Sequence, residues 1–268
     1  MESFNIGRVL SRTFKLVLGT LSSVGLFILA VQVISAVIQY FMQTMMKGKI
    51  EAAQATGEPS AALAMFSSGW YWTSIAFTLL LGAMSFAGSL HGLLQAADQR
   101  LVSFADCIQA GVAKLLPMLA LTILWYLGVG LGFMLLIVPG LILMTMWSVA
   151  MPVLVSENKG VLGSFGRSRS LTKGSRLLIF VTLLVFLVLL YVVFFLVAGA
   201  IIGGSIMGMG ARIETNMAGP NNPWAILATM PVGWLFASIL NALLVSLYLE
   251  TSLVKEGGVT GHLAATFE

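Results

Sequence analysis

The sequence carries very few charged side chains. Of its 268 residues, 9% are Asp, Glu, Lys or Arg, and 59% are hydrophobic. An ordinary soluble domain carries about 25% charged residues. A water-soluble fold of this size is therefore excluded, and the composition predicts a protein embedded in a lipid bilayer.

Residues that carry chemistry are equally scarce. The solitary Cys107 excludes an internal disulfide framework and a cysteine-based zinc site. No paired carboxylates and no nucleophile beside a base are visible, so we predict no enzymatic activity, no metal and no cofactor. The basic residues form no separate fold with a base-stacking platform, and nucleic-acid binding is not expected.

What the sequence does contain is long apolar runs. Five stretches have no Asp, Glu, Lys or Arg, and they are residues 16–46, 59–97, 115–156, 177–211 and 215–249. Because an α-helix rises about 1.5 Å per residue, roughly 20 residues cross the hydrocarbon core of about 30 Å. Each run is long enough to cross a membrane.

The run 115–156 would form a helix about twice as long as the membrane is thick, so it must fold back. Pro139 removes a backbone donor and Gly140 tolerates a positive φ, which predicts a tight hairpin there. The fold class is therefore an all-α membrane protein with six transmembrane helices. The predicted spans are about 19–44, 70–96, 115–137, 140–155, 177–203 and 224–249.

We expect one polytopic membrane domain over residues 1–256 and a flexible cytoplasmic tail over 257–268. The first span is too long for a signal-peptide core and lacks a convincing cleavage site, so we interpret it as a retained anchor.

The distribution of Lys and Arg predicts the orientation. Eleven of these residues lie on the side of the termini: Arg8, Arg12, Lys15, Arg100, Lys114, Lys159, Arg167, Arg169, Lys173, Arg176 and Lys255. The other side has Lys47, Lys49 and Arg212. By the positive-inside rule, both termini are expected in the cytoplasm.

Short amphipathic segments precede three of the spans. In residues 4–18, Arg8, Arg12 and Lys15 share one helical face and apolar side chains share the other. Residues 101–115 and 161–176 follow a similar design, more weakly in the second case. We predict three helix-hairpin units, each an interfacial helix plus two spans, which suggests internal duplication.

The basic residues are candidates for binding lipid phosphates. The set comprises Arg167, Arg169, Lys173 and Arg176, with Arg8, Arg12 and Lys15 from the first amphipathic segment. Each juxtamembrane cation contributes roughly 1 kcal/mol on an anionic leaflet. The alternative is that these residues only set the topology. Glu157 and Lys159 are expected to pair with the cluster.

Four uncharged polar residues within the spans form a candidate polar path: Gln32, Gln39, His91 and Asn241. The favoured interpretation of each is hydrogen bonding between helices or near a helix end. No charged residue falls at a mid-membrane position, which argues against an ion-coupled transporter.

Small-residue motifs occur at Gly88-xxx-Gly92, Gly128-xxx-Gly132 and Gly199-xxx-Gly203. Packing within the monomer is favoured, and self-association into a homo-oligomer is the alternative.

Several segments resemble a known family. They are Val138-Pro139-Gly140-Leu141, residues 147–155, Glu157, residues 160–165, the pair Arg167-Ser168, Leu171, Gly174 and Tyr248-Leu249-Glu250. These are similar to the membrane domain attached to bacterial glycerophosphodiester phosphodiesterases and to its stand-alone relatives, the YciC-like proteins. Ser252 departs from the pattern, because Arg commonly stands there. The resemblance implies a bacterial inner-membrane protein and does not extend to hydrolysis, whose soluble barrel is absent from this sequence.

The favoured function is a non-enzymatic, lipid-interacting module or scaffold in envelope homeostasis. Its expected partners are membrane lipids with anionic head groups, and another membrane protein or a second copy of the chain. The alternative is a transporter or channel for a small or amphipathic solute, and a lipid-modifying enzyme is the weakest candidate.

Overall fold

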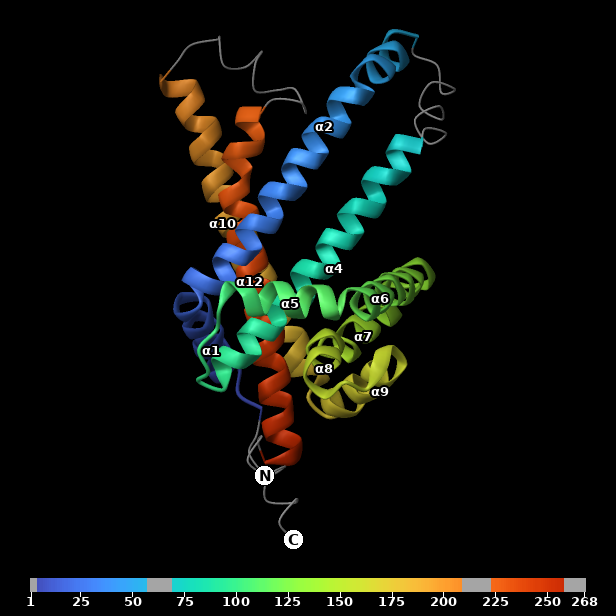
Figure 1. The fold of residues 1–268 in the computed structure, drawn as a ribbon. Helices are drawn as coiled ribbons and strands as arrows, with labels where there is room; N and C mark the ends of the chain where they lie inside the picture. The colour runs from blue at the N-terminus through green and yellow to red at the C-terminus, as the bar shows by residue number, and fades with distance from the viewer. Residues whose placement is uncertain (1–3, 57–68, 209–222, 258–268) are drawn as a thin grey trace. The chain divides into compact units, whose positions relative to one another are not determined.

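The computed structural model describes residues 4–56, 69–208 and 223–257, and every regular element among them is a helix (Figure 1). An all-α membrane fold is thereby confirmed. The elements are α1 (Ile6–Gly19), the π-helix η1 (Leu21–Gly25), α2 (Leu26–Thr56), α4 (Gly69–Ala97), α5 (Phe104–Ala113), α6 (Leu115–Leu135), α7 (Ile137–Met146), α8 (Ala150–Glu157), α9 (Gly160–Thr172), α10 (Arg176–Gly208) and α12 (Pro223–Glu256).

Five segments of the described chain are long and apolar enough to cross a membrane, and the bent pair α9–α10 raises the number to six. The five are Leu21–Phe41, Gly69–Ala97, Leu115–Leu135, Ile137–Glu157 and Met230–Glu256. The chain is thus a multi-pass membrane protein. The last segment continues past residue 249, where we had expected it to end, because the carboxylate of Glu250 is neutralised inside the fold, as shown below.

The hairpin in the run 115–156 turns earlier than expected. The helix breaks at Leu136, which is extended at φ −164° and ψ 153°. Pro139 lies in the first turn of α7, where its missing N–H costs no hydrogen bond. Gly140 is not among the residues with positive φ. Its role is close packing, since an added Cβ would lie 2.5 Å from the ring of Phe133.

The expected span 140–155 is not one straight helix. Residues Trp147–Val149 form a turn that separates α7 from α8. The ring of Trp147 lies over Gly128, where an added Cβ would come within 2.3 Å of it. The bulky indole and the facing glycine therefore fit together at the break.

A short helix precedes each of α2, α6 and α10, as the three predicted units require. These are α1, α5 and α9. Helices α9 and α10 meet at 100°, and Gly174, with φ +93°, lies in the connecting turn. An L side chain rarely adopts this backbone conformation, which explains a glycine at the corner.

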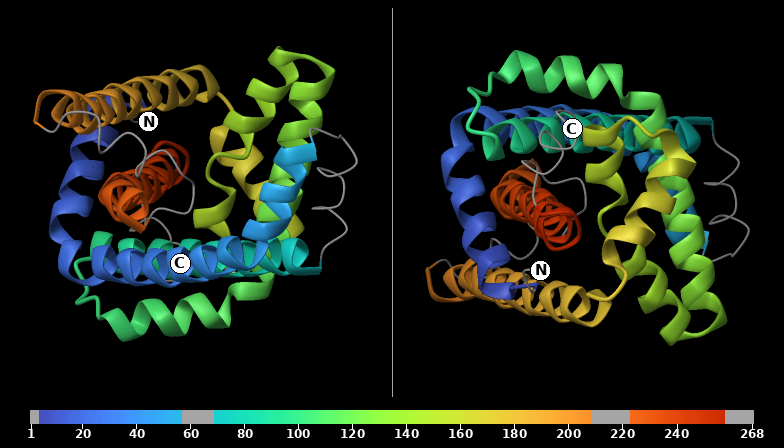
Figure 2. Two further views of the ribbon diagram at one scale, coloured as in Figure 1. Left: turned by 90° about the horizontal axis from the view of Figure 1, so that it is seen from above. Right: turned by 90° about the horizontal axis from the view of Figure 1, so that it is seen from below.

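The described helices divide into two compact units. The first comprises Met1–Ile28, Ala83–Tyr191 and Phe236–Glu268. Its core gathers around the C-terminal half of α12, which Figure 2 shows nearly end-on. The buried apolar residues come from α1, α8, α9, α10, α12 and the segment next to α1: Phe4, Val9, Val149, Val153, Leu171, Ile179, Phe186, Leu243 and Leu247.

The second unit comprises Leu29–Gly82 and Val192–Leu235. It contains the remaining parts of α2, α4, α10 and α12. Trp70 and Trp72 lie exposed at the start of α4. The Gly199-xxx-Gly203 motif falls on residues whose side chains lie outside the described set, as does the expected tail after residue 257.

Two of the small-residue motifs bring backbones together within the monomer. A Cβ on Gly88 of α4 would lie 2.3 Å from the carbonyl oxygen of Cys107 in α5 and 2.6 Å from the ring of Phe27. A Cβ on Gly132 would lie 3.0 Å from the Cα of Gly140. The favoured interpretation, packing inside one chain, is confirmed at these positions.

We expect Gly88→Ala to lower the free energy of unfolding by about 1–3 kcal/mol, because the added methyl group meets a backbone carbonyl that cannot move aside easily. Gly82→Ala in the same helix is the matched control, since nothing lies within 4 Å of its added Cβ. The control is expected to be neutral or slightly stabilising. Unfolding in detergent measures both, and equal effects would show that the α4–α5 contact is loose.

Candidate functional site

The carboxylate of Glu250 is buried, with a side chain that is 0% exposed. Its Oε1 accepts hydrogen bonds from the backbone N–H of Asn5 and from Arg8 Nε, both at 3.0 Å, and Arg8 Nη2 lies 2.9 Å away. Removing a carboxylate from water is costly unless it is paired and hydrogen-bonded. The two ends of the described chain are therefore joined by a buried ion pair.

The second oxygen of Glu250 is held more loosely. Arg12 Nη1 lies 3.8 Å from Oε2, which is an electrostatic contact and too long for a hydrogen bond. Among the described residues, neither of these two atoms has a hydrogen-bond partner. Arg8 and Arg12 were predicted to bind lipid phosphates. In the structure both contact the carboxylate of Glu250 in the same chain. Lipid binding by these two residues stays a prediction.

A second ion-pair cluster surrounds Glu157 at the end of α8. Arg167 Nε lies 2.9 Å and Lys159 Nζ 2.8 Å from its Oε2, and Tyr248 OH donates to its Oε1 at 3.1 Å. Arg167 also pairs with Glu256 of α12. The expected pairing of Glu157 and Lys159 with the basic cluster is confirmed for Arg167. We call the Glu250 and Glu157 clusters together the ion-pair belt.

Lys114 occupies a third polar position, at the junction of α5 and α6. Its Nζ donates to the backbone carbonyls of Leu154 and Val155 and to the Oδ1 of Asn158. Carbonyl groups at the end of a helix have no partner within it, and a cation there also complements the helix dipole. Lys114 therefore ties the start of α6 to the end of α8. Burial lowers the pKa of this ammonium.

Residues from the family-like segments meet around the end of α7. Ser168 Oγ and Thr172 Oγ1 of α9 both donate to the carbonyl of Met146, at 2.8 and 3.3 Å. The rings of Trp147 and Phe165 lie 4.8 Å apart. These residues hold the break between α7 and α8 against α9, and their observed role is packing.

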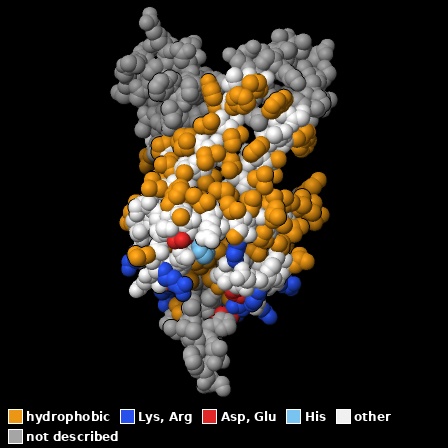
Figure 3. Space-filling view, viewed as in Figure 1, with side chains coloured by type: hydrophobic (Ala, Val, Ile, Leu, Met, Phe, Trp, Pro, Cys, Tyr) orange, Lys and Arg blue, Asp and Glu red, His pale blue; other side chains and the backbone are white. Residues whose placement is uncertain are grey.

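The remaining predicted phosphate ligands differ from Arg8, Arg12 and Arg167. Arg169, Lys173 and Lys15 are exposed, and Arg176 is half-buried. Within the described part of the chain, Arg169 and Lys173 make no ion pair. On the face shown in Figure 3, the charged side chains gather in one zone, and hydrophobic side chains are spread over much of the described surface outside it.

The candidate polar-path residues fall in both units. In the first, Asn241 Nδ2 donates to Ser89 Oγ at 2.9 Å in a buried position, and His91 bonds to Gln95 at 3.0 Å. In the second, Gln32 is half-buried and Gln39 is exposed. Asn241 thus joins α12 to α4, as the helix-bonding interpretation predicts. The path itself stays a prediction.

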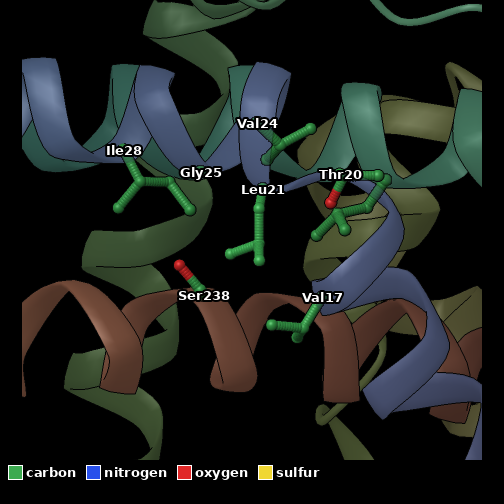
Figure 4. Close-up of a pocket in the computed structure, with 8 residues that line it drawn as sticks. Val17, Thr20, Leu21, Val24, Gly25, Ile28 and Ser238 are labelled. Carbon is green, nitrogen blue, oxygen red and sulfur yellow. The ribbon is translucent and has the colours of Figure 1, made fainter.

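A small pocket lies beside the π-helix η1 (Figure 4). It is lined by apolar side chains together with Thr20 and Ser238, and its volume is about 10 Å³. That is room for roughly one water molecule. This pocket is too small for a solute. Among the described residues, no group of three or more His, Cys, Asp or Glu side chains is arranged to hold a metal ion.

Comparison with protein-family models, with curated proteins and with solved structures found no match to this chain. The family resemblance of the sequence therefore stays a prediction.

The ion pair of Glu250 is the feature that the sequence interpretation missed. Ser252 in place of the family's Arg gave no basis for an ion pair at this end of α12. The partner is supplied instead by Arg8, 242 positions earlier in the sequence. The only available signal was Glu250 itself, a lone acid directly after a long uncharged run.

We expect Arg8→Met to lower the free energy of unfolding by about 2–4 kcal/mol, because the buried Glu250 loses its strongest partner and keeps only the backbone N–H of Asn5 and the distant Arg12. Lys15→Met, an exposed position on the same helix, is the control and should change it by less than about 0.5 kcal/mol. Chemical unfolding in neutral detergent compares the two. Equal losses would mean that the ion pair contributes nothing to stability.

Proposed function

We propose that this chain is a bacterial inner-membrane module that binds anionic lipid head groups at its basic side and works by binding rather than by catalysis. Its termini and the ion-pair belt lie on the cytoplasmic side. The proposal rests on the division of the basic residues into two groups. Arg8, Arg12 and Arg167 contact carboxylates, whereas Arg169 and Lys173 face outward.

The outward cations lie a few residues before exposed apolar side chains in the sequence. Leu177, four residues after Lys173, is 75% exposed, and Leu18, three residues after Lys15, is 70% exposed. A cation beside an apolar side chain matches the boundary between phosphate groups and acyl chains. The corner between α9 and α10 therefore combines both contacts that a phospholipid makes.

The transporter alternative has weaker support. The amide group of Asn241 donates a hydrogen bond to Ser89 Oγ, and the pocket beside η1 is too small for a solute. The hydrogen bond gives Asn241 a packing role between α12 and α4 in the first unit. A scaffolding role with a protein partner remains compatible with lipid binding, because the outward corner does not involve the core.

The test compares lipid retention by wild-type protein and by Arg169→Gln/Lys173→Gln in an equimolar mixture of phosphatidylglycerol and phosphatidylcholine, read by native mass spectrometry. At about 1 kcal/mol per cation, losing both should reduce the preference for the anionic lipid about thirtyfold. The ion-pair belt is untouched, so the variant should fold normally.

Arg100→Gln/Lys255→Gln is the matched control, because it removes two exposed cations from other positions. It should keep most of the preference. If both double variants lose it equally, net charge explains the binding and the proposed corner is not a site. No loss in the first variant also rejects the proposal.

A further inference from the structure

We propose that α6 and α7 form a re-entrant hairpin, which enters the leaflet on the side of the ion-pair belt, contacts its acyl chains and returns without crossing the bilayer. Length and composition alone admit both α6 and α7–α8 as spans. The proposal needs only that the chain is an integral membrane protein, and it does not depend on head-group binding.

The tip of the hairpin is apolar and exposed. Five consecutive side chains, Met134–Val138, are between 64% and 86% exposed. From Leu127 to Met144 no side chain carries nitrogen or oxygen. A turn that reached the far side would lie among head groups and water, where Trp, Tyr, Lys and Arg are the usual anchors. This tip matches hydrocarbon instead.

The other two hairpins of the chain differ in this respect. The segment between α2 and α4 follows Lys47, Lys49 and Glu51 and leads into Trp70. The segment between α10 and α12 carries Arg212 and Glu214. Charged or interfacial residues thus occur in or beside both of these segments of the sequence, whereas the tip of the middle hairpin has none.

The helices of the middle hairpin, with 21 residues in α6 and 10 in α7, are shorter than those of the other two. Helices α2, α4, α10 and α12 contain 31, 29, 33 and 34 residues. Helix α7 contains 10, which is about 15 Å and half the thickness of the hydrocarbon core. Residues Trp147–Val149 then form a turn between α7 and α8, and only together do the two helices reach the 21 residues of one candidate span.

The direction of the hairpin agrees. In both views of Figure 2, α12 is seen nearly end-on, whereas α6 and α7 are seen along their lengths. Within the first unit, the hairpin therefore runs across the direction of α12. If α12 follows the bilayer normal, this direction is compatible with a hairpin that stays in one leaflet.

Two backbone hydrogen bonds span the break at the tip, where unpaired polar groups would be costly in hydrocarbon. Leu136 N–H donates to the carbonyl of Gly132 at 3.1 Å, and Gly140 N–H donates to that of Leu136 at 3.4 Å. Pro139 has no N–H to satisfy. At the opposite end, Lys114 fixes the base of the hairpin to α8 beside the ion-pair belt.

The experiment places single cysteines in a Cys107→Ala background and treats spheroplasts and inverted membrane vesicles with a membrane-impermeant maleimide. Leu136→Cys and, independently, Met134→Cys test the tip. Gly69→Cys, where an added Cβ meets nothing within 4 Å, reports the far side. Gln109→Cys, exposed on α5, reports the side of the ion-pair belt.

We expect each reporter to react from one side only, and both tip cysteines to react from neither side until the membrane is dissolved and the protein unfolded. A fluorophore attached at Leu136→Cys before reconstitution should be quenched by doxyl groups on acyl chains and not by aqueous iodide. Labelling of the tip from the side of Gly69→Cys would show a full crossing. Labelling from the side of Gln109→Cys would place the hairpin outside the bilayer. Either result overturns the proposal.

Discussion

The carboxylate of Glu250 has no exposed surface, and a lone charge at that depth would destabilise the fold by several kcal/mol. Arg8 must therefore reach α12, and this requirement fixes the position of α1. With α1 in place, Phe4 and Val9 join Leu243 and Leu247 in the core of the first unit. One buried ion pair thus makes the amphipathic helix α1 part of the packed interior and not a separate interfacial helix. The same ion pair allows α12 to continue past Glu250 to Glu256.

The ion-pair belt also divides the basic residues by function. A cation that neutralises a buried carboxylate holds helices together, and its loss is a stability effect. A cation that faces outward near an exposed leucine does not hold helices together, and its position allows it to bind a phosphate. The sequence pattern of Lys and Arg does not distinguish the two groups, because both lie on the same side of the membrane and at similar distances from the spans. Only the position of the acids in the fold separates Arg167 from Arg169.

Most of the secondary structure was predictable from the sequence, because helix formation in lipid depends on local runs of apolar residues and on the absence of charge. The short helices before α2, α6 and α10 were also predictable from their periodicity. The position of the hairpin turn was not, since Pro139 and Gly140 suit both a turn and a first helical turn, and the choice depends on Gly132 packing against Gly140. The pairing of Glu250 with Arg8 was not predictable either, because it joins residues 242 positions apart and leaves no local pattern.

The middle hairpin shows why apolar length alone does not define a membrane crossing. Helix α6, with 21 residues, is as long as a span requires, yet a crossing also needs a turn that is stable in water at the far side. The segment Met134–Val138 lacks every group that would make it so, whereas the sequence between α2 and α4 and that between α10 and α12 contain charged residues. Because a hairpin returns to the side it left, both termini stay on one side whether it crosses or not, and the distribution of Lys and Arg is equally consistent with four crossings. The composition of the turn, rather than the charge balance or the length of the helices, is therefore the property that distinguishes the two topologies.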